Sequence, residues 1–247
     1  MTYCLAMSLS QGLVFASDSR TNAGVDYVTT FSKMHVFTPS PGRLFVVLTA
    51  GNLATTQEVL HRIKRDLDNP EAAESLRTVG YLFEAADYLG RVSCEVQRAH
   101  ASAMQQAGFS AEGTFIIGGQ IQGQPQAIFL VYPQGNFISA SPETPYLQIG
   151  ETKYGKPALD RVIDPGLSLE DGARLALVSL DATMRSNISV GPPLEVAICP
   201  KDGFVVAHYL NLKLESPLYR SMRERWQEGL REAFRQLPKF DWEGCGN

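Results

Sequence analysis

The stretch that organises this chain is its beginning, where residues 2–19 read TYCLAMSLSQGLVFASDS. From Thr2 to Leu9 the side chains alternate, with a large apolar side chain at every second position. An alternation with a period of two residues predicts a β-strand. Ser10-Gln11-Gly12 has the composition of a tight turn, and Leu13–Ala16 resumes the strand pattern. The stretch therefore predicts a β-hairpin.

The hairpin would bring polar residues together at its open end. If Ser10-Gln11 forms the centre of the turn, antiparallel pairing places Thr2 opposite Ser19 and beside Asp18. A threonine hydroxyl is a weak nucleophile until a base removes its proton. If Met1 is cleaved, Thr2 carries such a base in its own α-amine, whose ordinary pKa is about 7.7–8.0. Thr2 is therefore the candidate nucleophile.

Two further strands, predicted over Lys33–Phe37 and Leu44–Ala50, bring the candidate supporting groups. A Lys33 cation near the amine would lower the pKa of that amine, and Asp18 would keep the lysine charged and positioned. Gly51, between a strand and a predicted helix, could offer its backbone N–H to an oxyanion. Plainer interpretations stay open: a structural ion pair for Asp18 and Lys33, and ordinary strand-start and helix-start positions for Thr2 and Gly51.

The rest of the chain alternates between groups of helices and groups of strands. This order predicts a layered α+β fold in which helices cover two packed sheets, built as one domain over residues 1–247 with a core over about 2–210. The predicted elements are a polar loop at Asn22-Ala23-Gly24; helices from Gly51 to Asn69-Pro70, from about Glu71 to Gln106, over Gly155–Val162 and from Ser168 to Met184; and strands over Thr114–Ile117, Ala127–Tyr132, Phe137–Ala140, Leu147–Ile149, Leu194–Cys199 and Phe204–His208.

An amphipathic helix is predicted near the carboxyl end, over Glu215–Arg235 and reaching about residue 237, followed by a loose tail that contains Cys245. Its five Arg are balanced by four Glu, which argues against a basic helix that lies on a membrane. Two interpretations stay open, because the apolar face could dock on its own domain or on a neighbouring subunit.

Composition and charge exclude several classes of protein. A net charge of −4 gives no electrostatic footprint for nucleic acid. No apolar run is long enough to span a bilayer, no signal peptide is evident, and the four His show no metal-ligand spacing. The four Cys are scattered and are expected to be free thiols in a reducing compartment. We expect a cytoplasmic protein with no metal, no cofactor, no nucleic-acid partner and no membrane partner.

Three segments together resemble the proteasome-type N-terminal nucleophile hydrolases, and within them the bacterial ancestral-beta-subunit branch. Gly12–Arg20, with Gly24 and Lys33, is similar to the start of a mature proteasome beta subunit. Thr49-Ala50-Gly51 is similar to the segment that supplies the oxyanion hole, and Arg185–Gly191 to the later loop that supports the amino terminus. The opening Met-Thr-Tyr-Cys, the segments Phe15–Arg20 and Ser32–Phe37, and the long last helix point to the ancestral branch. The similarity extends to about His208.

The resemblance implies a four-layer αββα sandwich with a C-terminal helical extension, no propeptide beyond Met1, and self-assembly into rings or shallow helical stacks. It implies that Thr2 is nucleophile and base. The supporting catalytic residues that it implies are Asp18, Lys33, Gly51 and Ser189, and the substrate-binding residues are Thr21, Asn22, Thr49 and Gly51. An ATP-driven unfoldase partner stays unknown.

Two positions differ from the family pattern near the terminal amine. The loop position that usually holds an aspartate is Ser186, and the usual Gly-Ser pair is Gly150-Glu151. Glu151 could replace a missing hydrogen-bond acceptor, or it could hold the amine protonated and slow the enzyme.

The sequence thus predicts a threonine peptidase or amide hydrolase that works through an acyl-enzyme. Two alternatives remain: a hydrolase of non-peptide amides or isopeptides on the same fold, and a weakly active assembly protein.

Overall fold

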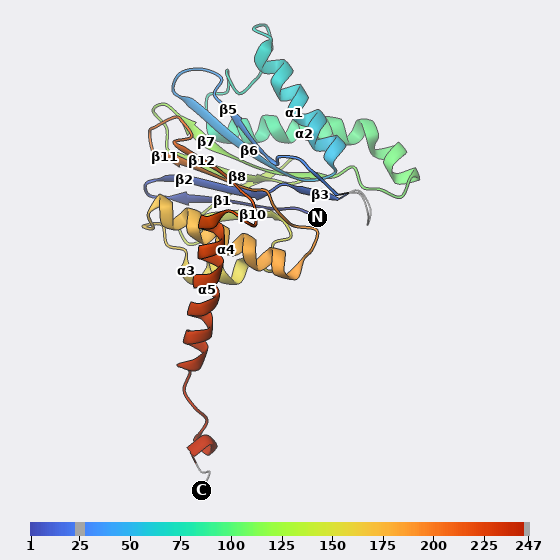
Figure 1. The fold of residues 1–247 in the computed structure, drawn as a ribbon. Coiled ribbons are helices and arrows are strands. Elements are labelled where there is room, and N and C mark those ends of the chain that lie inside the picture. Colours follow the sequence, from blue (N-terminus) through green and yellow to red (C-terminus); the bar gives the residue numbers. More distant parts are fainter. Residues whose placement is uncertain (23–27, 245–247) are drawn as a thin grey trace.

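The computed structural model describes residues 1–22 and 28–244. Two five-stranded antiparallel sheets lie face to face, with a pair of helices on the outer side of each (Figure 1). This is the predicted four-layer αββα sandwich, and the α+β fold is confirmed. The first sheet has the order β10-β1-β2-β11-β12 and the second has the order β5-β6-β7-β8-β9.

The first sheet contains the start of the chain and most of the late strands. Its members are β1 (Tyr3–Leu9), β2 (Gly12–Asp18), β10 (Tyr146–Gly150), β11 (Leu194–Pro200) and β12 (His208–Leu212). The second sheet and a small additional pair hold the other strands: β5 (Met34–Phe37), β6 (Arg43–Gly51), β7 (Gly113–Ile121), β8 (Ala127–Val131) and β9 (Phe137–Ser139), with β3 (Arg20–Asn22) paired to β4 (Val28–Thr30).

The helices form the outer layers. The helices α1 (Leu53–Asp68) and α2 (Leu82–Gln106) cover the second sheet, α3 (Lys156–Val162) and α4 (Leu169–Ser186) cover the first, and α5 (Pro217–Arg235) follows the last strand. Asn52 caps α1, because its side-chain oxygen accepts from the N–H of Thr55 at 3.2 Å. Ser168 caps α4 in the same way through the N–H of Asp171 at 3.0 Å, as its sequence predicts.

The amino-terminal hairpin has the predicted register. Cys4 lies opposite Ser17, and the same register extended by two residues places Thr2 opposite Ser19. Both faces of β1 are buried, because its odd-numbered side chains pack under α3 and α4 while Cys4 and Ala6 face the second sheet. The alternation in the sequence therefore separates two apolar layers rather than a buried face from a solvated one.

The predicted helix from Glu71 to Gln106 is wrong over its first part. Residues 71–81 form turns, and α2 begins only at Leu82. The Glu84 carboxylate accepts from the backbone N–H groups of Gly80 at 2.6 Å and Tyr81 at 3.1 Å, which satisfies the first donors of the helix. The turns still bury apolar side chains in the core under α1 and α2, which is why the segment imitates a helical pattern.

The last strand is displaced from its predicted position over Phe204–His208. The backbone φ is 58° at Asp202 and 52° at Phe204, so the chain turns there in a left-handed conformation. Pairing with β11 resumes only where Ile198 lies opposite His208, and residues 201–207 form the connection.

The polar loop predicted at Asn22-Ala23-Gly24 lies beside the β3–β4 pair. Asn22 ends β3, where its backbone pairs with Val28, which the sequence pattern did not predict. Ala23 and Gly24 lie outside the described residues, as does Cys245.

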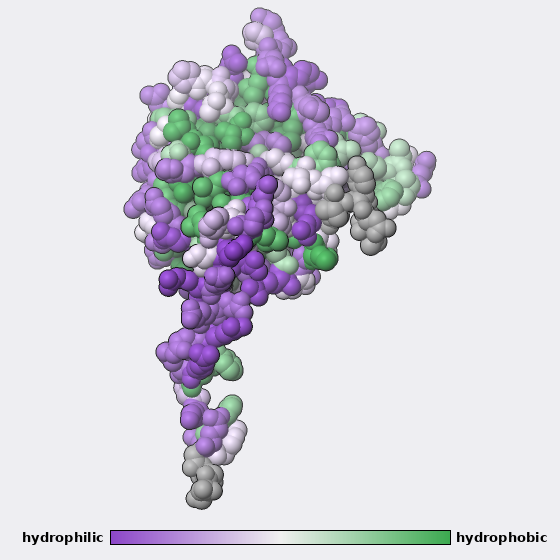
Figure 2. All heavy atoms as spheres, viewed as in Figure 1, coloured by the Kyte–Doolittle hydropathy of each residue, from purple (hydrophilic) through white to green (hydrophobic). Residues whose placement is uncertain are grey.

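Helix α5 extends away from the body of the protein (Figure 1). Its first half docks on α4, since Tyr219 is 1% exposed and donates its hydroxyl to Asp181 at 3.1 Å. The second half leaves Leu230 and Phe234 exposed, and a few hydrophobic side chains lie on the otherwise mostly hydrophilic surface of this projection (Figure 2). None of the described helices is long and apolar enough to cross a bilayer.

Candidate functional site

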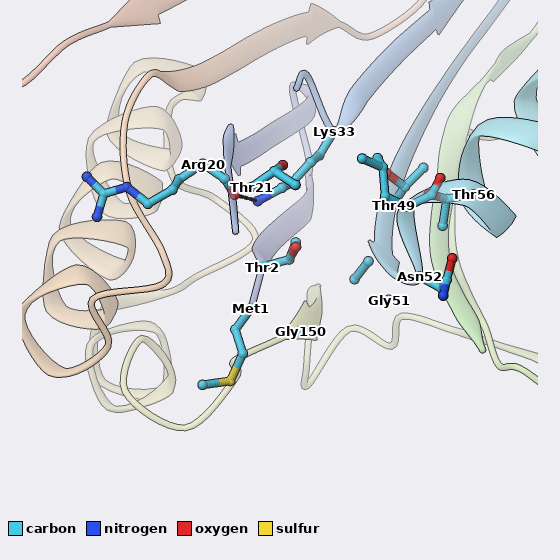
Figure 3. Close-up of a pocket in the computed structure, with 12 residues that line it drawn as sticks. Met1, Thr2, Arg20, Thr21, Lys33, Thr49, Gly51, Asn52, Thr56 and Gly150 are labelled. Atoms are coloured by element: carbon cyan, nitrogen blue, oxygen red, sulfur yellow. Dashed lines mark hydrogen bonds between the residues drawn. The ribbon is translucent and has the colours of Figure 1, made fainter. Parts of the chain in front are cut away.

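A cavity of about 550 Å³ opens where the first residues of the chain meet the carboxyl end of β6. Five of the predicted site residues line it: Thr2, Thr21, Lys33, Thr49 and Gly51 (Figure 3). The remaining lining residues are Met1, Arg20, Ala50, Asn52, Leu53, Thr56 and Gly150. The two sheets, the β3–β4 pair and the start of α1 therefore converge on the candidate nucleophile.

The backbone of Thr2 is held by the end of β10. The N–H of Glu151 donates to the carbonyl oxygen of Thr2 at 2.7 Å. Gly150 has a φ of 85°, and a Cβ placed on it would lie 2.0 Å from that same carbonyl oxygen. Only glycine permits both this conformation and this close approach. The position of Thr2 therefore depends on a contact with a residue far along the chain.

Asp18 and Lys33 form a buried ion pair beside Thr2. The Lys33 Nζ lies 2.6 Å from Asp18 Oδ1, with side-chain exposures of 7% and 0%. Asp18 Oδ1 also accepts from the N–H of Tyr3 at 3.0 Å, and its Oδ2 accepts from the N–H of Gly191 at 3.1 Å. Lys33 donates a second hydrogen bond to the carbonyl of Arg20 at 2.7 Å. Burial raises the pKa of Asp18 above its usual value, and the ammonium of Lys33 opposes that rise.

The charge of Lys33 reaches the start of the chain. Burial and then Lys33 lower the pKa of the terminal amine, which here belongs to Met1, while Asp18 and Glu151 oppose this change. A lower pKa increases the fraction of amine that is neutral near pH 7 and able to accept a proton. The site therefore favours the base form of the chain's own amino group.

Gly51 closes the other side of the cavity at the junction of β6 and α1. Its φ is 106°, and a Cβ there would lie 2.4 Å from the carbonyl oxygen of Glu112, so glycine is required. Nearby, the N–H of Thr49 donates to the carbonyl of Lys33 at 3.0 Å, which ties β6 to the lysine. The first turn of α1 also lines the cavity, and its N-terminal dipole favours negative charge there.

Ser189 lies behind the site, in the loop after α4. Its backbone N–H donates to Asn187 Oδ1 at 3.0 Å, and the Asn187 amide donates to Glu151 Oε2 at 3.1 Å. The carbonyl of Gly191 accepts from the N–H of Arg20 at 3.1 Å, so this loop also braces the backbone after Asp18.

Reasoning from the sequence missed several contacts around the ion pair. The carbonyl of Arg20 and the N–H of Gly191 act through their backbones and leave no signal in residue type. Glu195 did leave a signal in the sequence, since it is a charged residue inside the otherwise apolar strand Leu194–Cys199. No described Cys, His, Asp or Glu side chains gather in a group of three that could hold a metal ion.

The comparisons agree with this fold. A family model described as "Proteasome subunit" matches residues 2–199. The structure of "Anbu (ancestral beta-subunit)" from Yersinia bercovieri has 46% identity and a TM-score of 0.90, with 97% of this chain and 99% of that chain covered. "Helical Assembly of the Anbu Complex" from Pseudomonas aeruginosa has 42% identity and a TM-score of 0.90, with both chains covered completely at 100%. Anbu from Hyphomicrobium sp. strain MC1 has 40% identity and a TM-score of 0.87, covering 97% of this chain and 100% of that one. The comparison with curated proteins found no significant match.

Proposed function

Because this chain belongs to the proteasome-subunit family, and within it to the Anbu branch, we propose that it is an N-terminal threonine hydrolase that cleaves peptide or related amide bonds. The observation that carries the proposal is the buried ion pair of Asp18 and Lys33 in the wall of the same cavity as Thr2. A plain structural ion pair does not require a cavity beside it, or a buried chain end whose amine is made less basic by its lysine.

In the first half of the reaction, the hydroxyl oxygen of Thr2 attacks the carbonyl carbon of the substrate. The α-amine of Thr2, freed by removal of Met1, takes the hydroxyl proton, and the carbonyl oxygen becomes an oxyanion. The N–H of Gly51 and the start of α1 stabilise that oxyanion, and Lys33 stabilises the developing alkoxide. When the carbon–nitrogen bond breaks, the ammonium of Thr2 returns its proton to the leaving amine, and an ester remains on Thr2.

In the second half, water attacks the ester carbonyl while the amine of Thr2 accepts a proton from that water. The bond between carbon and the Thr2 oxygen then breaks, and the oxygen takes the proton back. Asp18 keeps Lys33 charged and oriented throughout, Ser189 supports the loop behind the amine, and Thr21, Asn22 and Thr49 hold the substrate.

The mechanism depends on removal of Met1, because the α-amine of Thr2 is part of a peptide bond until Met1 is cleaved. The test compares the native protein with a variant that carries an uncleavable extension before Thr2, using a set of fluorogenic peptides and simple amides as substrates. Intact mass should show that Met1 is absent from the native protein, and the extended variant should hydrolyse nothing. Equal hydrolysis by both proteins would refute the mechanism. Hydrolysis of the simple amides alone would favour the non-peptide alternative.

We also propose that the protein assembles with copies of itself into a ring or a helical stack. The relative from Pseudomonas aeruginosa is described as a helical assembly. The second half of α5 projects away from the body of this chain (Figure 1), and its apolar side chains, among them Phe234 at 74% exposed, are left uncovered. The alternative of a weakly active assembly protein draws on the same helix. It is also supported by Glu151, which raises the pKa of the Met1 amine and so opposes the neutral form that could act as a base.

A further inference from the structure

A buried carboxylate lies behind the candidate site and has no part in the proposed chemistry. Glu195 is 4% exposed at the second position of β11, where an apolar side chain would avoid the cost of burying a charge. Its partners in the described part of the chain are hydroxyl groups. Oε2 accepts from Ser19 at 2.9 Å, from Ser32 at 2.9 Å and, at the longer distance of 3.5 Å, from Ser17. Oε1 accepts from Tyr209 and lies 3.0 Å from the same Ser32 hydroxyl.

The two shortest hydrogen bonds to Oε2 come from residues that adjoin the ion pair in sequence. Ser19 directly follows Asp18, and Ser32 directly precedes Lys33. A backbone hydrogen bond from the N–H of Phe31 to the carbonyl of Ser19, at 2.9 Å, closes the same junction. Glu195 thus joins the two ends of the segment 19–32, which carries the cavity residue Thr21 between them.

Glu195 itself is placed by rigid structure. It pairs with Ser17 in the register between β11 and β2, in the middle of the first sheet. The other end of the carboxylate is held by Tyr209 on β12. Because Glu195 is fixed in the sheet, it sets the distance between Ser19 and Ser32. The residues next to these two serines are Asp18 and Lys33, which must stay in contact to form the ion pair.

We propose that Glu195 is a positioning residue for the reaction, which holds Ser19 and Ser32 together and so fixes the ion pair relative to Thr2. This inference rests on the proposed function of Thr2. Misplacing a catalytic group by about 1 Å can lower a rate on the order of 100-fold. Loss of the carboxylate should therefore slow the attack by Thr2 much more than it lowers the folded fraction of the protein.

The test measures acylation of Thr2 by a β-lactone at saturating concentration, followed by intact mass. The Thr2 oxygen attacks the lactone carbonyl, the ring carbon–oxygen bond breaks, and the released oxygen takes the proton, so the protein gains the whole mass of the lactone. Glu195→Ala should label roughly 10- to 100-fold more slowly than wild type. Glu195→Gln keeps the volume and one acceptor oxygen, so it should recover part of the rate.

Two single-hydroxyl variants separate positioning from general stability. Ser32→Ala removes one donor from Glu195, whereas Tyr219→Phe removes a hydroxyl donor from a different buried carboxylate, Asp181, and touches neither Glu195 nor the ion pair. Ser32→Ala should slow labelling several-fold, and Tyr219→Phe should label at nearly the wild-type rate. Ser32 lies at the surface, so its variant is expected to fold even if Glu195→Ala does not.

The outcomes separate the role of Glu195 from the proposed function of Thr2. If wild type is labelled and Glu195→Ala or Ser32→Ala labels equally fast, the role of Glu195 is refuted while the proposed function stands. Equal slowing by Ser32→Ala and Tyr219→Phe would also refute it, since a nonspecific loss of stability would explain both. Wild-type protein that is never labelled on Thr2 would refute the proposed function, and this inference with it.

Discussion

Replacing Lys33 with methionine keeps an unbranched side chain and removes the charge, so it tests the ion pair directly. In the variant, Asp18 stays buried at 0% exposed and loses an ammonium that lies 2.6 Å away. Breaking a buried pair by removing one partner costs about 3–5 kcal/mol. Asp18 retains the N–H groups of Tyr3 and Gly191, so we expect a value near the lower end, about 3 kcal/mol. For a chain of this size that corresponds to a fall in Tm of about 6 °C.

The cost should also depend on pH in a defined direction. Burial already raises the pKa of Asp18, with Lys33 opposing the rise, so removal of Lys33 raises that pKa further. A carboxyl group whose pKa is higher in the folded state than in the unfolded state binds more protons when folded, and stability then increases as pH falls. The difference between Lys33→Met and wild type should therefore shrink from neutral pH towards the ordinary Asp value of about 3.9.

Urea unfolding at matched protein concentration measures these differences, with Arg62→Met as the control. Arg62 pairs with Glu58 at 2.7 Å but is 27% exposed, so its loss should cost less than about 1 kcal/mol. The double variant Asp18→Asn with Lys33→Met should cost less than the sum of the two single variants, by at least about 1 kcal/mol. If Lys33→Met loses no more unfolding free energy than Arg62→Met, or if its loss grows towards acid pH, then Asp18 and Lys33 do not stabilise the fold as a buried ion pair.

Three further predictions test the surroundings of Thr2 and the last helix. Gly150→Ala should abolish hydrolysis and destabilise the fold by at least about 1–3 kcal/mol, because its Cβ would meet the carbonyl oxygen of Thr2; an active variant with an unchanged urea midpoint would contradict this. Glu151 raises the pKa of the Met1 amine, and its backbone N–H binds the carbonyl of Thr2, so we expect its carboxylate to raise the pKa of the Thr2 amine as well once Met1 is removed. Glu151→Gln should then move the acid limb of the pH–rate profile to lower pH, and a limb that stays or moves upward would exclude this role. Truncation of residues 228–247 removes the exposed apolar part of α5 and leaves its docked half, so light scattering should report a smaller particle; an unchanged molar mass per particle would rule out an intersubunit role.

Much of the architecture could be predicted because its signals are local. The hairpin register follows from a short turn, and it puts Thr2 beside Asp18 without any other part of the protein. The start of α4 at Ser168 could be predicted because its capping hydrogen bond joins residues only three positions apart. Where a boundary depends on a partner elsewhere, the sequence pattern fails. The sequence pattern predicts the start of α2 too early, because Leu76 and Val79 are buried in the core under α1 and α2 although the chain around them forms turns.

The candidate site divides in the same way. The sequence alone identified Thr2, Asp18, Lys33 and Gly51 as candidate site residues. These residue types lie at the ends of predicted strands and can perform the chemistry of acyl transfer. The resemblance implied that Gly150 lies near the terminal amine, but the tertiary structure was needed to show its contact with the Thr2 carbonyl and to place Glu195 behind the ion pair. Glu195 reaches Ser19 across 176 positions of sequence. Such contacts depend on how whole sheets pack, because residue spacing specifies only which side of a strand or helix a residue occupies, and not what it will face.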